Sequence, residues 1–123
     1  MKKLIRSFGY AFKGIAYATS SQLNFRIHLA ATTLAIIMGG AFHISITEWQ
    51  WVTLCITLVL VTEIFNTMIE TLTDLVSPGY SEKAGHIKDM SAGAVLIAAI
   101  FAFAIGIIIF LPKLLLLIKS YAS

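Results

Sequence analysis

Four polar residues within one apolar segment have the types and the spacing that chemistry requires. They are Glu63, Asn66, Glu70 and Asp74. At about 100° per helical residue, the other three fall within about 60° of Glu63 on a helical wheel. The four extend over about 16 Å of helix axis at about 1.5 Å per residue. We call this face the polar stripe, and its carboxylates and amide suit metal binding and proton transfer.

The composition places this stripe inside a membrane. Of the 123 residues, 59% are hydrophobic and 12% are charged, whereas soluble domains carry roughly 25% charged residues. A carboxylate at the bilayer centre costs about 2.5–3.5 kcal/mol on insertion scales. Two such residues on one face are therefore expected to have a function. The plain structural alternative is a pair of packing hydrogen bonds together with a solvated Asp74.

We predict an all-α integral membrane fold in a single domain over residues 1–123. An amphipathic surface helix is expected over about 2–16, with an apolar side and a basic side. Three spans follow at about 27–46, 49–75 and 82–111. Capping-box patterns at Thr19–Gln22 and Thr47–Gln50 mark the expected starts of two of these helices. Pro112 is expected to bend or to end the last helix.

The basic residues predict how the chain is oriented in the membrane. Five Lys and Arg precede the first span and two lie between the second and third spans, against two after the third. The positive-inside rule then puts the N-terminus and the 76–89 loop in the cytoplasm. No cleavable signal peptide is expected, because the basic start continues through Lys13 and Arg26. Nucleic acid is not an expected partner, since no soluble basic face is available.

Phosphoryl transfer from ATP to the hydroxyl of a membrane lipid is a reaction that could use this stripe. It needs a metal-bound phosphate, a positioned hydroxyl and a base. Mg²⁺ is held by one or two carboxylates together with the phosphates. We expect the deeper Glu63 to act as general base and the shallower Glu70 to bind the metal. The chain has no P-loop and no protein-kinase signature, so another architecture is implied.

A basic residue and an acid at the start of the third span would complete such a site. Lys88 would offset charge on the phosphates. Asp89 would either hold Lys88 or add to the metal shell. The plain alternative for the two is a charged pair at the membrane interface.

Three motifs together carry a resemblance to a known family. Residues 63–74 (EIFNTMIETLTD) are similar to E-x-x-N-[ST]-A-[IL]-E-x-x-[VA]-D, residues 87–95 (IKDMSAGAV) to A-K-D-x-x-[AS]-[AG]-A-V, and residues 24–28 (NFRIH) to N-F-R-x-H. These motifs resemble those of the prokaryotic diacylglycerol kinase family, which includes the undecaprenol kinases. The resemblance covers essentially the whole chain.

The resemblance implies roles for individual residues and an assembly. It implies a homotrimer of three-span subunits with the active site shared between neighbours. Glu63 would be the general base with Asn66 beside it, and Glu70 would bind the metal that carries ATP. The positions that match nucleotide contacts are Tyr10, Tyr80, Lys88 and Asp89.

One departure from the family pattern concerns the metal. The family usually has Glu where this chain has Gln22, and that Glu is the second metal-binding carboxylate. Gln22 is neutral and offers only an amide oxygen to Mg²⁺ or the nucleotide, so weaker binding of Mg²⁺-ATP is expected. The plain alternative is that Gln22 serves as the capping-box residue.

Several readings of the substrate and of the function stay open. The Arg26-Ile27-His28 block resembles the undecaprenol branch, with diacylglycerol as the alternative substrate, and His28 is otherwise an ordinary interfacial histidine. A small proton-coupled exporter would also carry a buried Glu, although such proteins commonly have four spans and one essential acid. A scaffold subunit would explain small residues on the third span but not the carboxylates.

Overall fold

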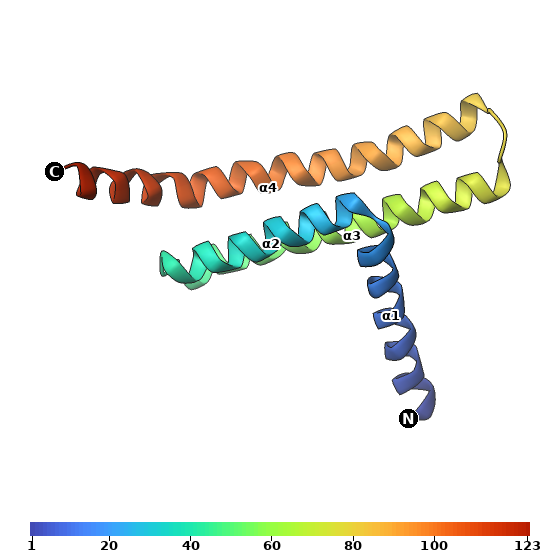
Figure 1. The fold of residues 1–123 in the computed structure, drawn as a ribbon, viewed down its shortest axis with the longest axis horizontal. Helices are drawn as coiled ribbons and strands as arrows, with labels where there is room; N and C mark the ends of the chain where they lie inside the picture. The colour runs from blue at the N-terminus through green and yellow to red at the C-terminus, as the bar shows by residue number, and fades with distance from the viewer.

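The computed structural model describes residues 1–123 as four helices joined by short connections (Figure 1). They are α1 (Lys2–Ser21), α2 (Leu23–Ala41), α3 (Ile46–Val76) and α4 (Glu82–Ala122). α3 and α4 run antiparallel along each other, α2 lies beside α3, and α1 leaves the bundle crosswise. α2, α3 and α4 are long and apolar enough to cross a membrane. The all-helical prediction with three spans is confirmed.

The helices meet along narrow seams and turn most of their apolar side chains outward. Only 13 of 123 residues are buried, and the exposed ones include many Leu, Ile and Phe side chains on the three long helices. Such a surface suits lipid, which is as apolar as these side chains. The few buried polar side chains in the seams are therefore exceptional, and they are Glu63, Asn66 and Ser91.

The junction between α1 and α2 lies at Gln22, not at Thr19. α1 continues through Thr19, whose hydroxyl donates to the Ile15 carbonyl at 2.8 Å. Gln22 is extended, with φ −117° and ψ 113°, and makes no side-chain cap bond to α2. The predicted capping box at Thr19–Gln22 is therefore wrong. The hydroxyl that would have capped a new helix is instead bonded within the preceding turn.

α2 ends in a Schellman motif at what we call the distal end of the bundle. The His43 N–H donates to the Gly40 carbonyl at 3.2 Å, and the Ile44 N–H donates to the Gly39 carbonyl at 3.2 Å. His43 takes φ 50°, the left-handed conformation that this motif requires. Ile44 is buried in a cluster that includes Met38 at its edge. The turn reverses the chain and sets the start of α3.

The start of α3 is capped by Ser45. The Glu48 N–H donates to Ser45 Oγ at 3.1 Å, and the Ser45 N–H donates to Glu48 Oε1 at 3.0 Å. This is a complete capping box. The predicted box at Thr47–Gln50 is therefore wrong by two residues. The preceding turn leaves Ser45 extended, so that Thr47 already lies inside the helix.

A glycine lets α2 and α3 approach closely at the distal end. A Cβ on Gly39 would lie 2.5 Å from Cη2 of Trp49. No side chain therefore fits there without moving the indole ring. Nearby, Ile44 of the turn and Val52 of α3 pack with Ile109 and Phe110 of α4, and Met38 of α2 packs against this cluster, so all three spans are joined at this end.

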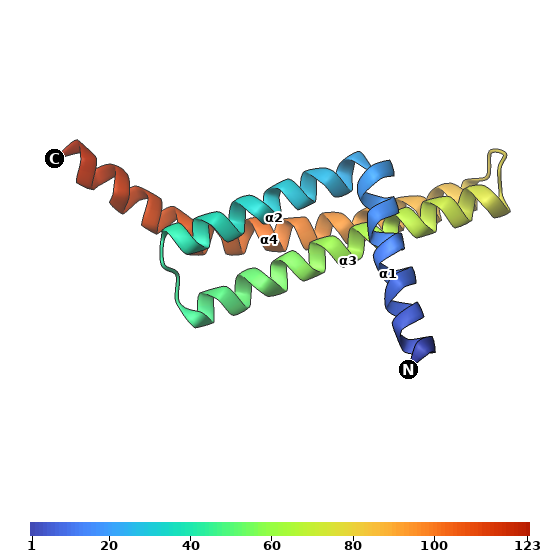
Figure 2. The same ribbon diagram turned by 60° about the horizontal axis from the view of Figure 1, so that its bottom comes forward.

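α4 is longer than the membrane requires. It has 41 residues and continues through Pro112 to Ala122. Of the two outcomes expected at Pro112, the helix bends and does not end. Figure 2 shows its last turns leaving the direction of the earlier ones and passing beyond the ends of α2 and α3. At its other end, Ser81 Oγ accepts from the Ala84 N–H at 3.3 Å and caps the helix.

Candidate functional site

The polar stripe of α3 faces the seam between helices, not the lipid. Glu63 is 2% exposed and Asn66 is 7% exposed. Glu70 is half-buried and Asp74 is exposed. The stripe thus runs from a closed inner position to an open one near the α3–α4 connection, which we call the network end of the bundle. A helical period places the four residues on one face, and packing against α4 and α2 covers the deeper two.

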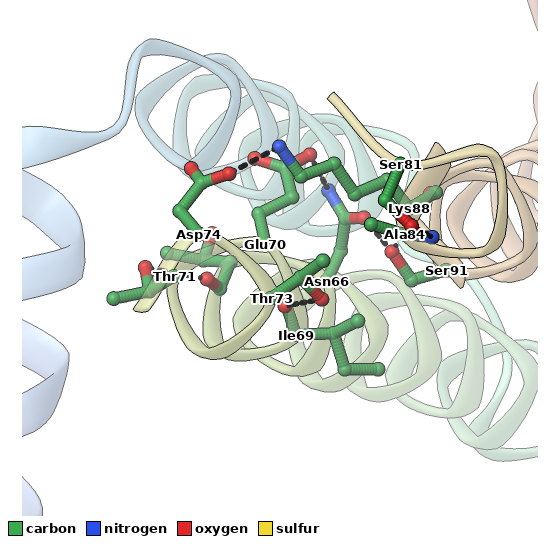
Figure 3. A network of polar contacts seen from close by, with 11 residues as sticks. Asn66, Ile69, Glu70, Thr71, Thr73, Asp74, Ser81, Ala84, Lys88 and Ser91 are labelled. Carbon is green, nitrogen blue, oxygen red and sulfur yellow. Dashed lines mark hydrogen bonds and ion pairs between the residues drawn. The ribbon is translucent and has the colours of Figure 1, made fainter. Parts of the chain in front are cut away.

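Asn66 links α4 to Glu70. Ser91 Oγ of α4 donates to Asn66 Oδ1 at 2.6 Å, and Asn66 Nδ2 donates to Glu70 Oε1 at 3.2 Å (Figure 3). Since the amide oxygen is used by Ser91, the amide N–H is directed to the carboxylate. The arrangement holds Glu70 Oε1 in place and leaves the second oxygen free of hydrogen bonds within the chain.

His28 of α2 lies beside the deepest acid. Its Nε2 is 3.6 Å from Glu63 Oε2. The distance is longer than a hydrogen bond, so a small movement or an intervening hydroxyl is needed to share a proton. Arg26, of the same motif, instead donates to the Ser20 carbonyl at 3.3 Å. Only the histidine of this motif is thus placed at the buried carboxylate.

Lys88 forms an ion pair with Asp74 at the network end (Figure 3). This pair joins the last polar residue of the α3 stripe to the first turns of α4. Asp89 is exposed and makes no ion pair. Within the chain, Lys88 therefore pairs with Asp74, a partner that sequence analysis did not consider, and not with its neighbour Asp89.

The remaining predicted residues lie apart from this network within one chain. Tyr10 on α1 is 63% exposed, and Tyr80 in the α3–α4 connection is 99% exposed. Gln22 is half-buried at the α1–α2 junction. No hydrogen bond or ion pair connects these three to the stripe. The structure thus brings together Glu63, Asn66, Glu70 and Lys88 and leaves the others at its margins.

The donor set fits a metal that arrives with phosphates better than a resident metal. No group of three or more His, Cys, Asp or Glu residues is placed to hold an ion. Mg²⁺ in nucleotide sites typically takes one or two carboxylates, with phosphates and water as its other ligands. Glu70 is such a carboxylate, since it is half-buried and held by Asn66 through one oxygen.

An apolar groove begins at His28 and runs toward the distal end. It has a volume of about 540 Å³ and lies between α2, α3 and α4. Val59 and Phe103 line its middle part, and Leu114 lines it near the distal end. A mostly apolar groove with one polar end is typical of a site for a lipid chain with a polar head.

Residues 9–110 match the family described as prokaryotic diacylglycerol kinase. The chain belongs to this family. It is 36% identical over 114 residues to an undecaprenol kinase of Bacillus subtilis, covering 93% of both chains. It is 40% identical over 113 residues to a diacylglycerol kinase of Synechocystis, covering 91% of this chain and 65% of that relative. A diacylglycerol kinase of Escherichia coli K12 is 32% identical over 100 residues, covering 81% of this chain and 82% of that relative.

Family membership and the names of these relatives indicate a lipid kinase. A kinase of this family acts with a nucleotide phosphate donor and a lipid alcohol acceptor. The predicted family is therefore confirmed, as is the prediction of a membrane enzyme.

Two residues of the network were not placed by sequence reasoning. Ser91 lies three residues after Lys88, about one helical turn on, so its side of α4 could have been inferred. His28 belongs to a motif that was recognised, but its contact with Glu63 depends on how α2 and α3 are aligned. No local pattern encodes that alignment.

Proposed function

We propose that this chain transfers the terminal phosphate of Mg²⁺-ATP to the hydroxyl of undecaprenol, giving undecaprenyl phosphate. The observation that carries the proposal is the position of His28, which lines the polar end of the apolar groove and lies 3.6 Å from the buried Glu63. Diacylglycerol is the alternative acceptor. The resemblance of the Arg26-Ile27-His28 block to the undecaprenol branch favours undecaprenol. The relative named undecaprenol kinase matches nearly the full length of this chain.

In the proposed reaction Glu63 accepts the proton of the lipid hydroxyl. The lipid oxygen then forms a bond to the terminal phosphorus, and the bond from that phosphorus to the bridging oxygen breaks, which releases ADP. General-base catalysis of this kind contributes about 10²–10⁴-fold in rate. His28 lies close enough to Glu63 to help position the hydroxyl between them.

Binding of the phosphates is assigned to the open half of the stripe. Glu70 and the Gln22 amide oxygen would hold Mg²⁺, which supplies positive charge to the phosphates when bound. Asn66 keeps Glu70 in position through its N–H. Lys88, held by Asp74, would face the phosphates.

The nucleotide itself is proposed to contact exposed residues at the margins. Tyr10, Tyr80 and Asp89 are all exposed, so that nothing in the chain blocks them from a ligand. Because they are not joined to the stripe within one chain, a neighbouring subunit could supply some of these contacts. This agrees with the proposed homotrimer with shared sites.

The proposed setting is a bacterial inner membrane with the N-terminus in the cytoplasm. The whole chain would act as one domain, with α1 lying along the cytoplasmic surface. Two features support this placement of α1: its first sixteen residues are all exposed, and it lies crosswise to the spans (Figure 1). The basic residues near the network end would then face anionic lipid and the nucleotide.

The test is transfer of labelled phosphate from Mg²⁺-ATP to undecaprenol and diacylglycerol in separate mixed micelles. Labelling of undecaprenol with little labelling of diacylglycerol is expected. Preference for diacylglycerol would overturn the choice of acceptor. Labelling of neither would overturn the kinase proposal in favour of an exporter or scaffold role.

A matched pair of variants tests the assigned base. Glu63→Gln keeps the shape of the side chain but removes the proton acceptor, so a rate loss of about 10²-fold or more is expected. The control is Glu82→Gln, because Glu82 is exposed at the start of α4. Equal rates for the two variants would contradict the role of Glu63.

A further inference from the structure

Two ion pairs between α3 and α4 mark the levels of the two membrane surfaces. Lys88 pairs with Asp74 at the network end, and Lys113 pairs with Glu48 at the distal end, Nζ to Oε2 at 2.7 Å. The paired residues are 26 positions apart on α3 and 25 positions apart on α4, or about 38–39 Å at about 1.5 Å per residue. A bilayer with its headgroups is about 40–45 Å thick. Both pairs therefore lie in the headgroup regions.

The part of α4 after Lys113 then extends beyond the distal surface. It contains five consecutive large apolar residues, Leu114 to Ile118, followed by Lys119, Ser120 and Tyr121. None of the five is buried by the rest of the chain, and Leu116 is 69% exposed. Transfer of such side chains out of water is favourable. A straight continuation into water would therefore be unfavourable.

Pro112 stands where the helix would need to turn. It lies one residue before Lys113 and inside α4. Proline removes one helical hydrogen bond and kinks the helix at that point. Figure 2 shows the turns that follow directed away from the axis of the span. The segment is thus free to lie at an angle to the membrane normal.

Apolar and polar residues of the segment 113–122 fall mainly on opposite sides of the helix. On a wheel at about 100° per residue, Leu114, Leu117 and Tyr121 fall within about 60° of one another, with Ile118 beside them. Lys113, Lys119 and Ser120 fall on the other side, where Leu116 is the one large apolar exception. An apolar side with flanking Lys and Tyr is typical of helices that lie in the headgroup plane.

We propose that residues 113–122 form an anchor that binds the lipid surface on the side of the membrane opposite the polar network. Pro112 sets the bend, the apolar side enters the acyl boundary, and Lys119 reaches lipid phosphates, while Lys113 stays paired with Glu48. The segment lies outside the region that matches the family, which ends at residue 110. It would fix the level of α4 in the membrane, together with the Glu48–Lys113 pair.

The test uses single cysteines in the full chain, labelled with bimane, in vesicles of phosphatidylcholine and phosphatidylglycerol. Leu117→Cys probes the apolar side and Ser120→Cys the polar side. Gly79→Cys in the α3–α4 connection is the aqueous control, and Ile100→Cys in mid-span is the deep control. Cys55 is the only native cysteine and is buried, so the labelled wild-type chain serves as the blank.

The expected result is a contrast between the two sides. Headgroup-level nitroxide lipids should quench the label on Leu117→Cys, and iodide should quench it several-fold less than the label on Ser120→Cys. Iodide access at both positions equal to that of Gly79→Cys would mean that the segment projects into water. Shielding from both quenchers would mean a protein partner. A depth equal to that of Ile100→Cys would mean a buried span. Each of these three results would overturn the proposal.

A second variant tests the bend and does not depend on catalysis. Pro112→Ala restores the missing backbone donor and should straighten α4. Iodide quenching of the label on Leu117→Cys should then rise, and nitroxide quenching should fall. Unchanged quenching would show that Pro112 does not set the bend.

Discussion

At the scale of single residues, the site depends on which side-chain oxygen and nitrogen atoms are not used in hydrogen bonds within the chain and so remain free for a ligand. Asn66 uses its oxygen for Ser91 and its N–H for Glu70, so Glu70 keeps one oxygen for a ligand. Lys88 is neutralised in part by Asp74 at the open end of the stripe. These contacts explain why the stripe contains an amide between its acids. An amide can donate to one carboxylate without adding a fourth negative charge to the stripe.

Gln22→Glu should strengthen binding of Mg²⁺-ATP. The substitution adds a carboxylate where the family pattern has one, and Mg²⁺ prefers charged oxygen ligands. The measurement is the apparent affinity for Mg²⁺ at fixed ATP in the lipid-labelling assay. Gln50→Glu is a matched control, because Gln50 is exposed on α3 at the distal end. Equal affinities for wild type and Gln22→Glu would contradict a metal-binding role at this position.

At the scale of elements, the end of α2 and the start of α3 are both determined by the short turn that joins them. The left-handed φ of His43 ends α2, and Ser45 then begins α3. The fixed turn places Ile44 in the distal core and brings Trp49 over Gly39. The connection of only a few residues therefore determines how α2 and α3 pack.

His43→Gly should stabilise the protein. A left-handed conformation costs an L residue roughly 1–2 kcal/mol, a cost that glycine largely escapes. We expect a gain in the free energy of unfolding of about 1 kcal/mol. The check is thermal unfolding of the detergent-solubilised chain, followed by tryptophan fluorescence. His43→Val should lower stability, because β-branched residues tolerate this conformation poorly. The reverse order of stabilities would contradict the Schellman assignment.

Gly39→Ala should loosen the contact between α2 and α3. The added methyl would meet the Trp49 ring, and overpacking of this kind typically costs about 1–3 kcal/mol. Gly40→Ala is the matched control, since a Cβ there meets no atom within 4 Å. Alanine in an open helical position should be neutral or favourable. The measurement is the thermal unfolding temperature of the two variants in the same detergent. Gly40→Ala should unfold at the higher temperature, and equal temperatures would contradict the close contact at Gly39.

At the scale of the whole molecule, one chain holds the acid–amide network but leaves α1 and the exposed tyrosines outside it. α3 and α4 form the firm part of the fold, with an ion pair at each end of the bundle. α1 contacts α2 and α3 near its C-terminal end and otherwise extends away (Figure 1). A helix so placed is suited to reach the site of a neighbouring copy, as the proposed homotrimer requires.

Mixing two inactive chains should restore activity if sites are shared in this way. Tyr10→Ala removes a proposed nucleotide contact on α1, and Glu63→Gln removes the proposed base on α3. In mixed assemblies, some sites would combine an intact Glu63 from one chain with an intact Tyr10 from another. Lipid labelling should then exceed the mean of the separate variants. Labelling equal to that mean would show that each chain supplies its own Tyr10.

By itself, the sequence determined the features that depend on the spacing of residues within one segment. The polar stripe, the three apolar spans and the family motifs all follow from spacing within a segment, because helical geometry is the same wherever a helix forms. The capping boxes at Thr19 and Thr47 were predicted wrongly since a cap depends on the turn before it. Only the tertiary structure decided that His28 lies beside Glu63 and that Lys88 pairs with Asp74. The same is true of the hydrogen bond by which Ser91 orients Asn66. These contacts depend on the rotation and axial alignment of neighbouring helices, which are set by side-chain packing between distant parts of the chain.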